Sequence, residues 1–90
     1  MEYNLIYDNR DNAYTTTVNP LTGDCILRVE FSGRGRVAIR KSNNGIAPWP
    51  IVLMSPPSES VEIYIFGRTK GKSIKIQTSQ MPAKCELYKV

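Results

Sequence analysis

Residues 25–41 read CILRVEFSGRGRVAIRK, and this stretch decides the fold class. In its first seven residues every second side chain is apolar: Cys25, Leu27, Val29 and Phe31. A turn-forming run, Ser32–Gly35, follows, and the alternation then resumes with Val37 and Ile39. Period-two alternation on both sides of a turn is typical of two antiparallel strands with one face buried and the other in water.

The same rhythm extends over the rest of the chain. Segments rich in β-branched and aromatic residues alternate with clusters of Gly, Pro, Asn, Asp and Ser, at a spacing of about 10–12 residues. The expected strands are Tyr3–Tyr7, Ala13–Val18, Cys25–Phe31, Arg36–Lys41, Glu59–Phe66, Ser73–Thr78 and Lys84–Val90, with Ile46–Met54 as an irregular eighth segment. We therefore predict an all-β chain: one domain over residues 1–90, built as a compact antiparallel β-sandwich of the immunoglobulin-like kind with about seven to eight short strands.

The alternation also assigns faces within the later strands. It turns these side chains inward: Val61, Ile63, Ile65, Ile74, Ile76, Cys85 and Leu87. Lys75 and Gln77 fall between the inward residues of their segment and are expected to face water.

The stretch Ile46–Met54 is apolar throughout and does not alternate. Its two prolines cannot donate hydrogen bonds to a neighbouring strand, which favours an edge strand or an extended loop. Two interpretations are open. In one, Trp49 closes an end of the core and Ile51 and Leu53 enter it. In the other, the segment is an exposed contact for a protein partner, formed by Pro48, Trp49 and Pro50.

The residue types favour a chain without catalytic chemistry. None of the 90 residues is histidine, which excludes Ser-His-Asp and Cys-His catalysis and histidine-ligated zinc. Glu59 and Glu62 are three residues apart and would point to opposite faces of a strand. Asp8 and Asp11 lie in a predicted turn, where we expect them to accept backbone hydrogen bonds. We therefore predict no catalytic residue, no cofactor and no metal, and a non-enzymatic function.

The formal net charge of +4 is unevenly distributed along the chain. Residues 1–30 carry five acidic and two basic side chains, whereas residues 31–90 carry three acidic and ten basic ones. Bases without acids cluster at two predicted turns: Arg34 in one turn with Arg36 directly after it, and Arg68 and Lys70 in the other. If both turns lie at one end of the sandwich, they form a positive rim for an acidic protein surface or for nucleic acid.

Cys25, Trp49 and Cys85 follow the Cys–Trp–Cys order of immunoglobulin domains, although Trp49 falls later than in that pattern and position 83 is Ala rather than Tyr. With this order and strand rhythm, the chain resembles the small immunoglobulin-like sandwiches that decorate the capsids of tailed phages. The resemblance implies binding to the outer face of a capsid shell. The cysteines then have two expected states, two buried thiols or a disulfide that joins the sheets.

We accordingly expect a non-enzymatic structural module, present in many copies and bound to a viral capsid, to a similar large assembly or to copies of itself. The alternatives are a basic β module that binds nucleic acid and a small regulatory or inhibitor protein. The sequence shows neither a secretory signal nor a transmembrane run. We therefore expect a virion or cytoplasmic location and no membrane partner.

Overall fold

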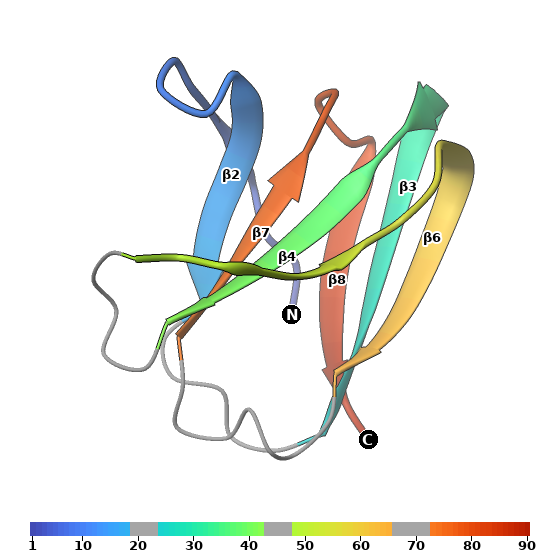
Figure 1. Ribbon diagram of the computed structural model, residues 1–90. Coiled ribbons are helices and arrows are strands. Elements are labelled where there is room, and N and C mark those ends of the chain that lie inside the picture. The colour runs from blue at the N-terminus through green and yellow to red at the C-terminus, as the bar shows by residue number, and fades with distance from the viewer. Residues whose placement is uncertain (19–23, 43–47, 66–72) are drawn as a thin grey trace.

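The computed structural model describes residues 1–18, 24–42, 48–65 and 73–90, which form strands and contain no helix (Figure 1). The eight strands are β1 (Ile6–Asp8), β2 (Ala13–Val18), β3 (Cys25–Gly35), β4 (Val37–Ser42), β5 (Ile51–Met54), β6 (Ser58–Ile65), β7 (Ser73–Thr78) and β8 (Lys84–Lys89). They form a five-stranded sheet in the order β1-β2-β7-β4-β5 and a three-stranded sheet in the order β6-β3-β8. All pairings are antiparallel. The predicted all-β, antiparallel sandwich is confirmed.

The core lies between the two sheets and consists mainly of the side chains that alternation turns inward. These residues are less than 9% exposed: Cys25, Leu27, Val29, Phe31, Val37, Ile39, Val61, Ile63, Ile65, Ile74, Ile76 and Cys85. Full burial of one aliphatic side chain is worth about 1.5–3 kcal/mol. A register slip of one residue would turn a whole strand's apolar set into water, so the hydrophobic pattern specifies the register.

The strand order keeps the inner pairs of an immunoglobulin domain and exchanges the terminal strands. In the immunoglobulin fold the second strand pairs with the fifth, the third with the sixth, the first lies beside the second and the last beside the sixth. If β2 is counted as the first immunoglobulin strand, β3 and β6 correspond to the second and fifth strands, and β4 and β7 to the third and sixth. Both of these pairs are present here. However, β2 lies beside β7, and β8 lies beside β3. The sandwich therefore has its own topology at its terminal strands.

The first residues of the chain contact both sheets. The backbone N–H of Tyr3 donates to the carbonyl oxygen of Cys85 at 2.8 Å, and that of Leu87 donates to Met1 at 2.9 Å. Leu5 is then buried in the core, and β1 pairs with β2 in the other sheet. The expected strand Tyr3–Tyr7 is therefore replaced by the shorter β1, because the chain changes sheets at Leu5.

The predicted turn Ser32–Gly35 belongs to β3, which continues to Gly35. The pairing of β3 with β6 shifts register between Glu30 and Gly35, so the strand contains an irregularity of the β-bulge type. In the turn after β1, the backbone N–H of Arg10 donates to the Asp8 carboxylate at 2.9 Å, as predicted for Asp8, whereas the Asp11 carboxylate accepts from the side chain of Gln77. Asn12 adopts the left-handed conformation with φ of 51°, which Asn tolerates better than most residues.

Cys25 and Cys85 are buried thiols. Both lie in the three-stranded sheet, where Cys25 is opposite Lys89 and Cys85 is opposite Val29. Four residues of strand separate the two positions by about 13 Å, whereas a disulfide needs Cα atoms within about 7 Å. The alternative of a disulfide between the sheets does not fit this arrangement. Burial raises the pKa of Cys25, and it raises the pKa of Cys85 to about 11, so the thiols stay protonated at neutral pH.

Candidate interaction surface

β5 is an exposed apolar strand at the edge of the five-stranded sheet. Its side chains are 44% (Ile51), 51% (Val52), 39% (Leu53) and 54% (Met54) exposed. The interpretation that placed Ile51 and Leu53 in the core is therefore wrong. A three-stranded sheet is too narrow to cover all five strands of its partner, so the outermost strand β5 projects past it. In Figure 1, β5 is the yellow-green strand that crosses in front of β4.

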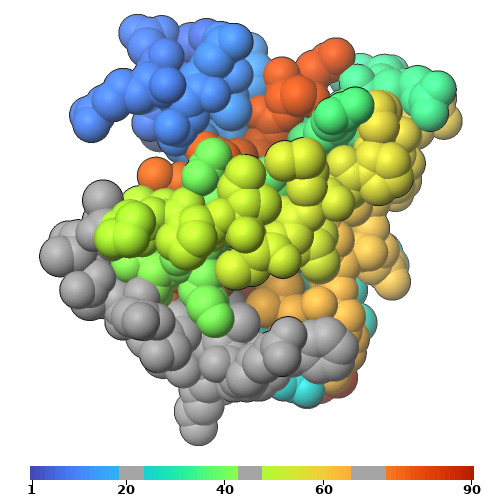
Figure 2. All heavy atoms as spheres, in the orientation of Figure 1, coloured from blue at the N-terminus to red at the C-terminus, as the bar shows by residue number. Residues whose placement is uncertain are grey.

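The segment before β5 extends this surface onto the outer face of the sheet. Pro48 and Pro50 are exposed, and Trp49 is half-buried. The Trp49 ring lies over the side chain of Lys75, with the Nζ atom 4.9 Å from the ring centroid. Lys75 is the outward residue between two core isoleucines of β7. Trp49 therefore packs on the face opposite the core and does not close the core. Figure 2 shows residues 48–57 in yellow-green as a continuous ridge across the molecule.

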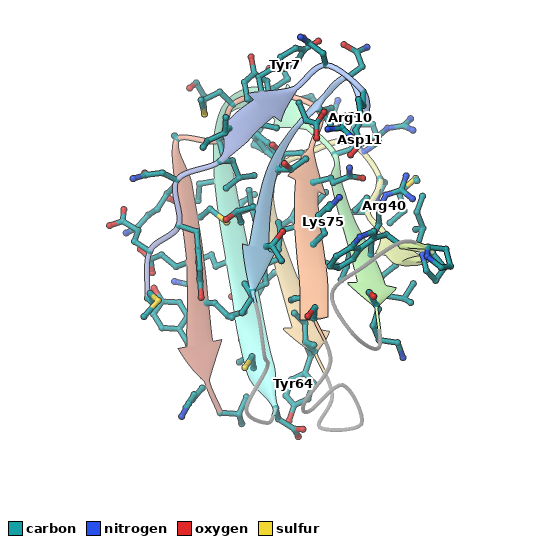
Figure 3. The ribbon with its side chains drawn as sticks, turned by 90° about the vertical axis from the view of Figure 1, so that its left-hand side faces the viewer. Tyr7, Arg10, Asp11, Arg40, Tyr64 and Lys75 are labelled. Carbon is teal, nitrogen blue, oxygen red and sulfur yellow. The ribbon has the colours of Figure 1, made fainter. Side chains whose placement is uncertain are left out.

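A polar network holds the start of this ridge. The Arg40 side chain donates from Nη1 to the carbonyl oxygen of Trp49 at 2.8 Å and from Nε to Oε1 of Gln77 at 2.7 Å. Gln77 in turn donates to the Asp11 carboxylate at 2.8 Å, and the Lys75 amine lies 4.0 Å from the same carboxylate. Figure 3 shows Asp11, Arg40 and Lys75 together on this sheet face. Gln77 lies on the outer face as predicted, but this network covers it until only 6% is exposed.

Among the four strands that lie at the sheet edges, β1, β5, β6 and β8, β5 is the one without a charged side chain. The others contain Asp8, Glu59 and Glu62, and Lys84, Glu86 and Lys89, respectively. Charges on edge strands oppose pairing with other chains. The uncharged stretch extends over residues 42–58, well beyond β5 itself. The molecule therefore leaves one edge without this protection.

Arg34 and Arg36 lie at the opposite end of the ridge from Trp49. Arg34 donates to the carbonyl oxygen of Pro57 at 3.2 Å, and the backbone N–H of Arg36 donates to Ser79 Oγ at 2.9 Å. Arg34 also lines an open hollow of about 500 Å³ that it shares with Glu59 and two serines. Both arginines are exposed and can contact an acidic partner beside the end of β5.

Arg68 and Lys70 lie outside the described residues. The strands on either side of them end far from Arg34 and Arg36. Ile65 is opposite Cys25, at the beginning of β3, whereas Arg34 lies at the far end of that strand and Arg36 directly after it, about 30 Å away. The strand ends therefore do not support the condition for a positive rim, that the two basic turns lie at one end of the sandwich.

Among the described residues, the acidic and basic halves of the sequence do not form separate acidic and basic surfaces. Arg28 from the acidic half pairs with Glu62 from the basic half at 2.9 Å, and Lys75 lies near Asp11. The five-stranded sheet takes β1 and β2 from the first half and β4, β5 and β7 from the second. Because the halves interleave, opposite charges mix across the surface.

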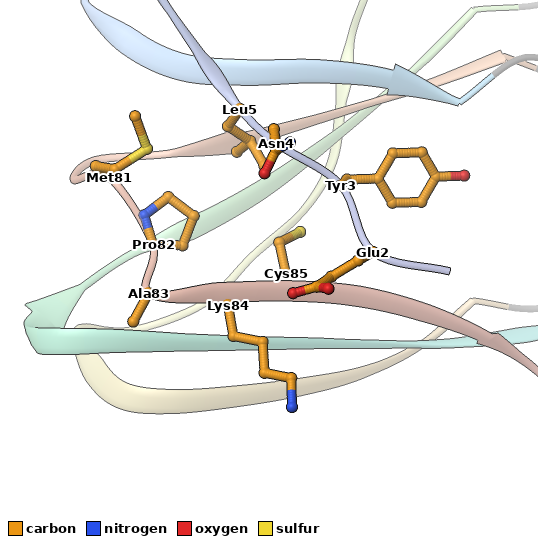
Figure 4. Close-up of a pocket in the computed structure, with 9 residues that line it drawn as sticks. All are labelled: Glu2, Tyr3, Asn4, Leu5, Met81, Pro82, Ala83, Lys84 and Cys85. Carbon is orange, nitrogen blue, oxygen red and sulfur yellow. The ribbon is translucent and has the colours of Figure 1, made fainter.

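A second hollow, of about 270 Å³, opens between the N-terminal segment and the start of β8 (Figure 4). Cys85 and Lys84 contribute to its lining, together with Glu2, Tyr3, Asn4, Leu5, Met81, Pro82 and Ala83. Nucleophilic chemistry requires a thiolate, and the raised pKa of Cys85 keeps that sulfur protonated at neutral pH. Within the described ranges, no three His, Cys, Asp or Glu side chains are grouped so that they could hold a metal ion.

The described part of the chain has no helix of the length and apolarity needed to cross a bilayer. Comparison of the chain with protein families, with curated proteins and with solved structures gives no match. The fold and surface thus define a small β-sandwich with one uncharged apolar edge.

One of the two interpretations of the sequence made Ile46–Met54 an exposed contact and named Pro48, Trp49 and Pro50 within it, but it did not name the four exposed side chains of β5. The signal for the missing part was present: residues 46–58 contain no charge, and prolines stand on both sides of Ile51–Ser55. The supporting residues Arg40, Gln77 and Asp11 left no such signal, because they come from three separate segments that only the sheet brings together.

Proposed function

We propose that the chain is a non-enzymatic structural module that binds in many copies to a large protein assembly such as a viral capsid. The ridge formed by residues 48–57 is its contact surface. The observation that carries the proposal is the exposure of an uncharged apolar edge strand, because exposed apolar patches mark contact sites and no charge on this edge opposes pairing.

The size of the surface favours binding in many copies. Each side chain of β5 is roughly half-exposed, so its burial against a partner contributes on the order of 1 kcal/mol. Trp49 adds an aromatic anchor, the residue type most often dominant in interfaces. A single contact of this size is weak. An assembly with many sites and many copies gains avidity, since several contacts must open together for release.

Arg34 and Arg36 extend the contact at the far end of the ridge. Exposed charges at the rim of an interface mainly steer association and select partners. We therefore expect an acidic patch on the partner next to its apolar contact, and weaker binding at higher salt when these arginines are the main electrostatic contribution.

The test is sedimentation of the native chain in lysate of its source, with and without nuclease. Sedimentation with a large particle that survives nuclease supports the proposal. If nuclease moves the chain to small size, the basic surface binds nucleic acid and the proposal fails. Sedimentation near 10 kDa in both samples also contradicts it and favours a regulatory or inhibitor protein.

Two matched variants locate the contact. Met54 in β5 and Met81 between β7 and β8 are both 54% exposed. Met54→Lys is expected to remove the chain from the particle fraction, whereas Met81→Lys leaves it there. Trp49→Ala is expected to weaken particle binding with the fold intact by circular dichroism. If Trp49→Ala unfolds the isolated domain, or if both methionine variants bind equally, the contact lies elsewhere.

A further inference from the structure

We propose that β5 pairs antiparallel with β5 of a second copy of this chain, which joins the two five-stranded sheets into one across a two-fold axis. This deepens the proposed function and rests on its choice of contact surface, because it names another copy as a direct partner of the ridge within the assembly.

The backbone of β5 has hydrogen-bonding groups that point away from its sheet. The N–H of Ser55 donates to the carbonyl oxygen of Val37, on the β4 side, at 2.8 Å. Successive residues in a strand direct these groups to opposite sides, so Met54 directs its N–H and C=O away from β4. The register passes from Leu53 opposite Ile39 to Ile51 opposite Arg40, which leaves Val52 without an opposite residue in β4.

Charge is the reason to choose a second copy. When a strand pairs antiparallel with its own copy about a two-fold axis, each side chain meets a side chain of the same strand, and the position of the axis decides which one. Some registers of β6 or β8 would place Glu59, Glu62 or Lys89 opposite its own copy, whereas an axis at Cys85 would place Lys84 opposite Glu86. Like charges opposite each other in a sheet are unfavourable. β5 has only apolar side chains, so every register of its pairing with a second copy is free of this penalty.

The prolines set the length of the pairing and its register. Pro50 and Pro56 cannot donate hydrogen bonds, so pairing is confined to the segment between them, residues 51–55. This segment is centred on Leu53, and the same prolines end it in both copies. A two-fold axis at Leu53 places Val52 opposite Met54 of the second copy, which matches the outward backbone groups of Met54. The contact closes after two copies, because it uses the same edge of each.

The net charge of +4 gives the association a diagnostic salt dependence. Two copies repel each other through their overall charge while the contact itself is uncharged, so salt screens the repulsion and strengthens pairing. Binding to nucleic acid would respond in the opposite way, because salt weakens phosphate contacts.

The first experiment is analytical ultracentrifugation of the purified full chain from micromolar to millimolar concentration, at low and high salt. We expect a monomer–dimer equilibrium that salt shifts toward dimer. Leu53→Lys places two like charges at the axis and is expected to weaken dimerisation about tenfold or more. Met81→Lys adds the same charge elsewhere and serves as the control. Circular dichroism checks that each variant folds.

A charge exchange tests the register. Val52→Glu or Met54→Lys alone weakens dimerisation, because a charge then meets an apolar side chain. The double variant places the Glu of each copy opposite the Lys of the other. It is expected to dimerise about tenfold or more tightly than either single variant. If the double variant is no better than the single variants, this register is overturned.

Cross-linking tests the contact directly. In the proposed register Leu53 faces its own copy at a non-hydrogen-bonded position, where Cα atoms are about 4.5 Å apart, so Leu53→Cys is expected to form a disulfide dimer on mild oxidation. The buried native thiols have raised pKa values and are expected to react far more slowly. Met81→Cys is the control, and equal cross-linking of both variants contradicts the proposal.

The two proposals fail separately. A purified chain that stays monomeric at every concentration and forms no specific cross-link overturns β5 self-pairing, even if the same chain still sediments with a particle. Conversely, if the chain dimerises through β5 but never sediments with a particle, the proposed pairing stands and the proposed role in a large assembly is contradicted.

Discussion

Gly35 shows how a single residue serves packing in this fold. It lies buried at the end of β3, and a Cβ atom built there would be 2.7–2.8 Å from three carbons of the Phe31 ring. Real Cβ atoms do not approach other carbons so closely, so the ring occupies the space that any other side chain would need. The sequence pattern assigned Gly35 to a turn, but its position is explained by this close contact.

Gly35→Ala is expected to destabilise the domain by about 1–3 kcal/mol, because the Phe31 ring must leave its place in the core. Gly33→Ala is the matched control. Nothing lies within 4 Å of a Cβ atom at that position, so its effect should stay within about 0.5 kcal/mol. Urea unfolding of the two variants measures the difference, and equal stabilities would show that the ring moves aside without cost.

At the scale of an element, the polar network around Arg40 holds the segment that leads into β5. Arg40 reaches from β4 to the Trp49 carbonyl, and the backbone N–H of Lys41 donates to the carbonyl oxygen of Pro50 at 3.1 Å. Prolines cannot contribute N–H groups of their own to the ladder. The segment before β5 is therefore held by donors from β4 and by the Lys75 amine over the Trp49 ring.

Arg40→Met is expected to loosen this segment while the core stays folded. Loss of hydrogen bonds from a partly buried guanidinium lowers the free energy of local opening by about 1–2 kcal/mol, so exchange of the Lys41 amide hydrogen should accelerate about 5- to 30-fold. Hydrogen exchange followed by NMR measures this. Arg28→Met removes an arginine from the other sheet and should leave that amide unchanged; the same acceleration in both variants would contradict the assignment.

At the scale of the whole molecule, the N-terminal segment ties the two sheets together. Residues before Leu5 pair beside β8, and residues after it pair with β2, so Leu5 lies where the chain crosses the core. The strand rhythm predicted a strand in this region, but periodicity along a chain carries no information about a change of sheet.

Leu5→Ala is expected to destabilise the domain by about 2–4 kcal/mol, because it removes a core side chain and leaves a cavity between the sheets. Ile6→Ala is a control from the neighbouring position, since Ile6 is 75% exposed and Leu5 only 4%. Thermal or urea unfolding compares them. If the two variants lose similar stability, Leu5 does not connect the sheets in the way that the structure indicates.

The sequence by itself determined the class of the fold and most of the core. Alternation is a local property, because successive side chains of any strand point to opposite sides, and burial of one side follows from the hydrophobic effect. Residues such as Leu27, Val37 and Ile76 could therefore be assigned to the core before the sheets were known. The absence of charge around β5 was equally visible in the sequence.

Only the tertiary structure decided the sheet order, the separation of the cysteines and the exposure of Ile51 and Leu53. Apolar residues are buried only where an opposing surface exists, and the three-stranded sheet ends before it reaches β5. Whether the two basic turns lie at the same end of the sandwich likewise depends on the directions of β3 and β6. Strand order and sheet width follow from contacts between residues far apart along the chain, and the residue pattern within one segment does not determine them.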